Sequence, residues 1–141
     1  MVQANLSVSH AGVLRGIHFH RSQADYWVFL EGRAFIALLD LRSGSPTERT
    51  MLTLTIDAGE GRRGIYIPPG VAHGFLAITD TWLQYMVDVY YTGDDEHGFV
   101  WDDPEAGVPW PIDRPVLSER DAAAIPLADV LGQAPAYDAQ P

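Results

Sequence analysis

The chain has 141 residues, of which 47% are hydrophobic and 20% are charged, and these values are typical of one globular domain that buries a core. Its formal net charge of −10 argues against nucleic acid as a general partner. It contains no cysteine, which excludes disulfides and thiolate metal sites, and it shows neither a signal peptide nor an apolar run of membrane-spanning length, so we expect a cytoplasmic protein with no membrane partner.

The first apolar segment, GVLRGIHFHR at 12–21, carries His18 and His20 one residue apart. In a β-strand, residues i and i+2 point to the same face, so a strand here directs both imidazoles the same way. Segments rich in β-branched and aromatic residues predict further strands. These segments are 25–32, 33–42, 49–57, 63–69, 73–79 and 82–91. Glycine and proline turn sequences separate them, which predicts an all-β sandwich or barrel.

The last third of the chain has a different pattern. The acidic run at 94–96 is expected in a solvated loop, and 101–118, with four prolines, is expected to be an ordered loop. Residues 118–133 predict one or two short helical turns near the C-terminus, with Ser118 as N-cap and Asp121 as its capping partner. Residues from about 134 to 141 are expected to form a flexible tail. No repeat or linker is evident, so we predict a single domain over 1–141.

Two spaced motifs predict a cupin jelly-roll barrel. The first, G-x5-H-x-H-x4-E-x6-G, runs from Gly12 to Gly32 with Asp25 in place of the glutamate, and the second, P-x-G-x2-H, ends at His73. The four residues expected to converge inside the barrel are His18, His20, Asp25 and His73. Imidazoles with a carboxylate suit a divalent transition metal. The alternative is that these histidines are polar groups satisfied by hydrogen bonds on an inner wall.

Longer blocks at 12–19, 39–47, 67–75, 89–111 and 117–127 resemble the dTDP-4-dehydrorhamnose 3,5-epimerases and related keto-sugar epimerases. The resemblance implies an isomerase that removes a proton beside a ketone and returns it on the other face. The implied substrate is a 4-keto deoxysugar nucleotide (a dTDP-sugar) or a repurposed secondary metabolite. The resemblance also implies a homodimer that requires no cofactor.

The resemblance further assigns roles to individual residues. It implies that His18 is the base, that Asp121 tunes it and that Tyr85 is the acid. It places Arg15 and His73 in the polar part of the substrate pocket. It places Tyr90 and Tyr91 near the nucleotide base, and Arg62 and Arg63 near the phosphates.

The sequence departs from the family pattern at positions that bear on function. The family usually has Gln at His20, Lys at Asp25 and Asp at Ile36, and a preceding segment that helps to hold the nucleotide is expected to be missing. The first two changes each add a metal ligand. Two alternatives to the epimerase therefore remain: a metal-dependent cupin enzyme whose divalent ion is held by His18, His20, Asp25 and His73, and a non-catalytic sugar-binding barrel.

Overall fold

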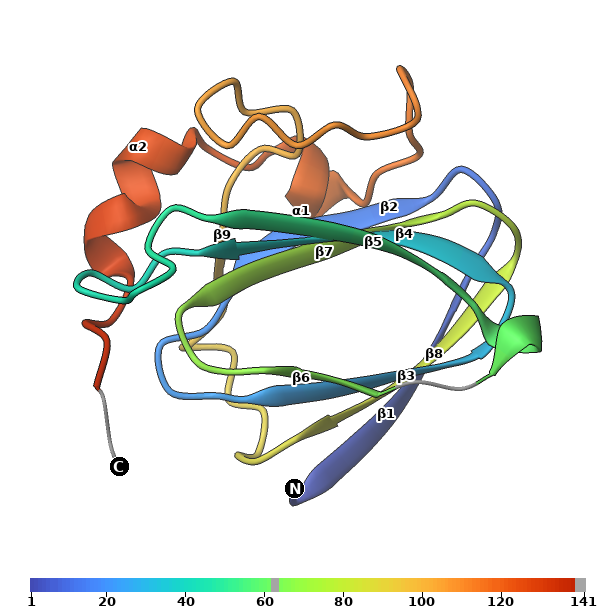
Figure 1. The fold of residues 1–141 in the computed structure, drawn as a ribbon, viewed down its shortest axis with the longest axis horizontal. Helices are drawn as coiled ribbons and strands as arrows, with labels where there is room; N and C mark the ends of the chain where they lie inside the picture. Colours follow the sequence, from blue (N-terminus) through green and yellow to red (C-terminus); the bar gives the residue numbers. More distant parts are fainter. Residues whose placement is uncertain (62–63, 139–141) are drawn as a thin grey trace.

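The fold is a two-layered β-structure, seen in a computed structural model that describes residues 1–61 and 64–138 (Figure 1). Its strands are β1 (Gln3–Ser9), β2 (Leu14–Phe19), β3 (Asp25–Glu31), β4 (Arg33–Asp40), β5 (Met51–Asp57), β6 (Gly64–Ile67), β7 (Val71–Ala77), β8 (Thr81–Val87) and β9 (His97–Gly98). One antiparallel sheet has the order β1-β8-β3-β6, and the other has the order β5-β4-β7-β2-β9. The predicted all-β jelly-roll barrel is confirmed.

The hydrophobic core has two parts, one on each face of the five-stranded sheet. Inside the barrel, aromatic rings of both sheets pack edge to face, as Trp27 and Phe29 do against Phe75. On the outer face, Phe19 and Phe99 pack with Leu127 under the C-terminal segment. In Figure 1 that segment, drawn in orange and red, covers the outside of this sheet. The five-stranded sheet is therefore covered by apolar side chains on both faces.

The C-terminal segment contains short helical turns, as predicted. They are α1 (Glu119–Ala122), α2 (Leu127–Val130) and the 3-10 turn η2 (Leu131–Gln133), and a further 3-10 turn, η1 (Ala58–Glu60), follows β5. Ser118 caps α1, because its Oγ accepts a hydrogen bond from the Asp121 amide at 3.1 Å. Within the described residues, no helix has the length and apolar character that crossing a membrane requires.

Some boundaries differ from the sequence-based expectations. Strand β1 was not predicted, and β8 ends at Val87 rather than at residue 91. In the expected tail, the Tyr137 amide donates to the Ser43 carbonyl at 2.9 Å, so this described part of the tail is docked on the domain. Residues 139–141 lie outside the described part of the chain.

Candidate active site

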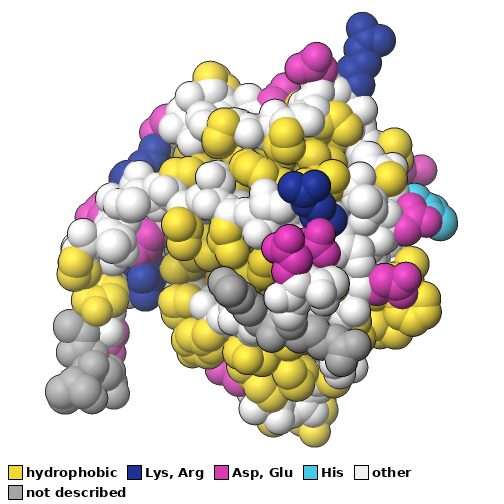
Figure 2. All heavy atoms as spheres, turned by 45° about the vertical axis from the view of Figure 1, so that its right-hand side comes forward, with side chains coloured by type: hydrophobic (Ala, Val, Ile, Leu, Met, Phe, Trp, Pro, Cys, Tyr) yellow, Lys and Arg dark blue, Asp and Glu magenta, His cyan; other side chains and the backbone are white. Residues whose placement is uncertain are grey.

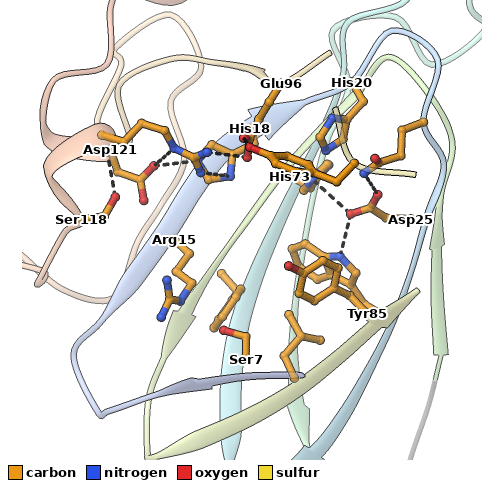
Figure 3. A pocket seen from close by; sticks show the side chains of 16 residues that line it. Ser7, Arg15, His18, His20, Asp25, His73, Tyr85, Glu96, Ser118 and Asp121 are labelled. Atoms are coloured by element: carbon orange, nitrogen blue, oxygen red, sulfur yellow. Dashed lines mark hydrogen bonds and ion pairs between the residues drawn. The ribbon is translucent and has the colours of Figure 1, made fainter. Parts of the chain in front are cut away.

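A cavity of about 390 Å³ opens between the two sheets and carries most of the polar groups singled out in the sequence. Strand β2 contributes Arg15 and His18, and His20 follows at its end. The opposite sheet contributes Tyr85 from β8. Figure 3 shows two groups of side chains in this cavity, with Asp121 and His18 toward one side and His20, His73 and Asp25 toward the other. The cavity therefore brings together a hydrogen-bonded histidine and a separate cluster of potential ligands.

A β-bulge in β2 explains how three of its residues face the cavity. Arg15 pairs with Phe75 of β7, and His18 pairs with His73, so the register shifts by one residue between them. In a regular strand, positions 15 and 18 would point to opposite faces. The extra residue reverses that alternation, and Arg15, His18 and His20 all line the cavity.

The bulge also needs close approach of two backbones. A Cβ atom added to Gly16 would lie 2.8 Å from the Cα atom of Gly74 and 2.9 Å from the His73 carbonyl oxygen. A Cβ atom added to Gly74 would meet the Arg15 carbonyl oxygen at 2.9 Å. Both positions are glycine because no side chain fits between these strands.

His18 is held by a carboxylate from the distant helical turn α1. Its Nε2 lies 2.6 Å from Oδ1 of Asp121, whose side chain is 4% exposed. A carboxylate only accepts hydrogen bonds, so Nε2 carries a hydrogen, and in the neutral ring Nδ1 has the lone pair, 3.5 Å from Nη2 of Arg120. Burial alone would raise the pKa of Asp121, but the hydrogen bond and the charge of His18 outweigh it and hold that pKa below its ordinary value. Asp121 therefore remains ionised beside the imidazole.

Arg120 and Glu96 complete this side of the cavity, and neither was singled out from the sequence. Arg120 forms an ion pair with Glu96 at 2.5 Å, and its Nη2 lies 3.0 Å from Nε2 and 3.5 Å from Nδ1 of His18. The acidic run at 94–96 is thus more than a solvated loop. Arg120 could have been noticed as the neighbour of Asp121 in the first turn of α1, whereas no local pattern marked Glu96.

The second group consists of His20, Asp25 and His73, all buried. One candidate ligand atom from each lies within 4.8 Å of the others. Asp25 accepts hydrogen bonds from the Gln23 amide at 2.7 Å and from the Trp27 indole at 3.2 Å. Burial lowers the pKa of His73 from 6.5 to about 4 against the raising effect of Asp25, so this ring is neutral at pH 7.

Tyr85 lies half-buried on the sheet opposite His18. Burial raises the pKa of its phenol, and the negative charges of Asp25 and Glu96 raise it further. Tyr85 is therefore a protonated O–H group at neutral pH. His18, held by Asp121, and a phenol that keeps its proton face the same cavity from different sheets, as proton transfer on two faces of a bound molecule requires.

The remaining predicted site residues fall into different places. His18 is hydrogen bonded to Asp121 and does not belong to the cluster of potential metal ligands. Tyr91 lines the cavity, but Tyr90 is 71% exposed and does not, because β8 ends at Val87 and the following loop turns outward. Arg62 and Arg63 lie outside the described residues.

Comparison with known proteins identifies relatives that match most of this chain. The model of the dTDP-4-dehydrorhamnose 3,5-epimerase family matches residues 1–129. A dTDP-4-dehydrorhamnose 3,5-epimerase of Mycobacterium tuberculosis is 42% identical over 135 residues, which cover 91% of this chain and 66% of that protein. The chain thus spans slightly less than two thirds of that relative.

Solved structures show the same similarity. NovW, a 4-keto-6-deoxy sugar epimerase from the novobiocin gene cluster of Streptomyces spheroides, is 41% identical with a TM-score of 0.89, and the match covers 96% of this chain and 71% of NovW. ChmJ, a 3'-monoepimerase from Streptomyces bikiniensis solved with dTDP-quinovose, is 37% identical with a TM-score of 0.86, and the match covers 96% of this chain and 71% of ChmJ.

Proposed function

Because this chain belongs to the dTDP-4-dehydrorhamnose 3,5-epimerase family, we propose that it is an isomerase that moves a proton beside a ketone. The observation that carries the proposal is the pair of His18 and Asp121 on one side of a cavity that Tyr85 enters from the opposite sheet. Family membership alone leaves open which chemistry this chain retains. The proposal is supported by the position of His18 and Tyr85, which line one cavity from different sheets.

In the proposed reaction, Nδ1 of His18 takes the proton from the carbon next to the carbonyl. Asp121 accepts the Nε2 hydrogen bond, fixes the ring orientation and stabilises the positive charge that the ring acquires. Negative charge then develops on the carbonyl oxygen, where N–H and O–H donors of the cavity stabilise it. Tyr85 returns a proton on the other face, which inverts the carbon. Since base and acid both come from the chain, this reaction requires no cofactor.

The proposed substrate is a 4-keto-6-deoxysugar carried on dTDP. Relatives are named for such sugars, and ChmJ was solved with dTDP-quinovose. Arg15 lines the cavity and offers a guanidinium to an anionic nucleotide, whereas Arg120 is ion paired with Glu96. Tyr91 offers an aromatic ring at the same opening. A charged nucleotide sugar does not cross a bilayer unaided, so the same proposal places the protein in the cytoplasm.

We also propose that the protein is a homodimer formed through the four-stranded sheet. Its edge strand β1 exposes Leu6 and Val8, and Val8 pairs with the exposed Trp82 of β8. Figure 2 shows hydrophobic side chains grouped on the surface in one view of the molecule. An exposed apolar edge is a liability for a monomer, and a second copy would cover it. Sedimentation that shows only monomer at micromolar concentration would contradict the dimer.

The test of the isomerase is solvent exchange. Incubation with dTDP-4-dehydro-6-deoxyglucose in deuterated water should incorporate deuterium next to the ketone, as followed by NMR and mass spectrometry. His18→Asn should slow incorporation by about 100-fold or more, the range expected for losing a general base. The matched control is His10→Asn, a change at an exposed histidine that pairs with Asp80 and does not line the cavity. Undiminished exchange in His18→Asn would overturn the assignment of the base.

A further inference from the structure

The cluster of His20, Asp25 and His73 has an arrangement of hydrogens that the proposed isomerisation does not use. Nδ1 of His20 lies 2.8 Å from the Asp95 carbonyl oxygen, and Nδ1 of His73 lies 3.0 Å from that of Val71. A carbonyl oxygen only accepts, so each Nδ1 carries the ring hydrogen. In the neutral form of each ring, Nε2 is therefore left with a lone pair and has no hydrogen to donate to Asp25.

The distance between His73 and Asp25 supports the same conclusion. Nε2 of His73 and Oδ2 of Asp25 are 3.8 Å apart, which is too long for a hydrogen bond. Two ligands that share one ion at bonds of about 2.1 Å are separated by roughly 3 to 3.5 Å, so a small adjustment of these side chains suffices. The Gln23 amide and the Trp27 indole both donate to Asp25 and hold its carboxylate in place.

From these contacts we propose that His20, Asp25 and His73 bind one divalent transition-metal ion, with the imidazoles coordinating through Nε2. One candidate ligand atom of each of these three buried residues lies within 4.8 Å of the others, so the three converge on one point. A divalent cation at that point is attracted by the carboxylate charge and by the imidazole lone pairs. Two imidazole nitrogens and one carboxylate oxygen favour a first-row transition metal over Mg²⁺ or Ca²⁺, which prefer oxygen ligands.

The three proposed ligands line the same cavity as His18 and Tyr85. When bound, the proposed ion supplies a Lewis acid for an oxygen of a ligand that reaches it. His18 is not a ligand in this proposal, because its Nε2 is engaged by Asp121. The proposed site thus contains three of the four ligands expected from the sequence motif. Metal binding there does not depend on the isomerase activity.

The test uses Co²⁺, whose visible absorption reports coordination. The full chain is stripped with a chelator and titrated with Co²⁺ by calorimetry and absorption spectroscopy. The wild-type protein should bind one equivalent, and Zn²⁺ should displace it. Asp25→Asn and His20→Gln should each weaken binding at least tenfold, as expected when a ligand is lost. Circular dichroism of each metal-free variant checks that the fold is retained.

Two further variants separate this proposal from the proposed function. His10→Asn, at an exposed histidine outside the cavity, should bind Co²⁺ as the wild type does. His18→Asn should also retain Co²⁺ binding, although it loses solvent exchange. A wild-type protein that binds no Co²⁺, or a His18→Asn variant weakened as much as Asp25→Asn, would overturn the site. Loss of exchange activity alone would leave the metal result standing.

Discussion

Two carboxylates of this chain are equally buried but have different surroundings. Asp25 is 4% exposed and Asp40 is 5% exposed. Asp40, at the end of β4, accepts hydrogen bonds from the Arg42 guanidinium at 2.8 and 2.7 Å, from Ser45 at 2.6 Å and from Thr47 at 2.7 Å. Asp25 has two neutral N–H donors and faces imidazole nitrogens that bring no hydrogen.

The difference shows how burial alone fails to distinguish structure from function. Burial would raise the pKa of Asp40, but hydrogen bonds from Arg42, Ser45 and Thr47 outweigh it and hold that pKa well below its usual range. The Asp40 carboxylate is therefore fully hydrogen bonded to residues 42–47, and these bonds hold that loop in place. Asp25 lacks a charged donor, so its negative charge is available to a ligand. The number and charge of the hydrogen-bond donors, rather than exposure, distinguish the structural role of Asp40 from the ligand-binding role proposed for Asp25.

The largest expected effect concerns another buried carboxylate, Asp121, which supports His18. Asp121→Asn should leave the fold intact and slow solvent exchange by about 100-fold or more, because an amide stabilises a charged imidazole poorly. The measurement is deuterium incorporation in the variant and the wild type at equal concentration. Exchange at the wild-type rate would show that Asp121 only caps α1 and that the proposed pair is not catalytic.

The next effect concerns the stability of the Asp40 loop. Asp40→Asn should lower the free energy of unfolding by about 2 to 4 kcal/mol, because it leaves the Arg42 charge largely buried without its partner. Urea unfolding followed by circular dichroism measures this loss. Solvent exchange in the folded variant should persist, since Asp40 does not line the cavity. A loss below about 0.5 kcal/mol, the level of an ordinary surface pair, would contradict the structural role.

A smaller effect is the pH dependence of that loss. The folded pKa of Asp40 is depressed, so its stabilisation is fully present above the ordinary value of 3.8 and declines as the pH falls below it. The difference in unfolding free energy between the wild type and Asp40→Asn should therefore shrink by about 1 to 2 kcal/mol between pH 7 and pH 3. A difference that stays constant or grows toward pH 3 would reverse the assigned sign.

The smallest effect on stability is expected at Asp25, whose carboxylate accepts hydrogen bonds from two neutral donors. Asp25→Asn should change the unfolding free energy of the metal-free protein by less than about 1 kcal/mol, because no charged partner is stranded. The same urea titration, with chelator present, compares it directly with Asp40→Asn. If both substitutions destabilise the protein equally, the contrast between the two carboxylates is wrong.

Local sequence predicted much of the fold because most strands carry their own signal. The segment 49–57 contains the alternating LTLTI, and β5 lies within it at Met51–Asp57. Strand β1, QANLSVS, has only Leu6 and Val8 as large apolar residues, and it pairs with β8 between 72 (Ser9 with Thr81) and 84 (Gln3 with Val87) residues later. Such pairing is a long-range property, so a local pattern did not reveal it.

The same limit applies to the site. Family membership could be identified because matching blocks extend from residue 12 to 127, and the metal motif correctly brought His20, Asp25 and His73 together. The separation of His18 from that cluster depends on Asp121, which is 103 residues away. Glu96 enters the cavity through its ion pair with Arg120, which is again a contact between distant segments.

The close glycine contacts along β2 have a consequence for how this barrel can evolve. A Cβ atom on Gly98 would lie 2.6 Å from the Ile17 carbonyl oxygen, just as Gly16 and Gly74 admit none between them. Backbone atoms of the neighbouring strands therefore contact the strand that carries His18, and substitutions can shift its position only slightly. His20 and Asp25 lie at or beyond strand ends and can be exchanged one at a time. New specificities should thus arise by replacing side chains around a base whose position is inherited unchanged.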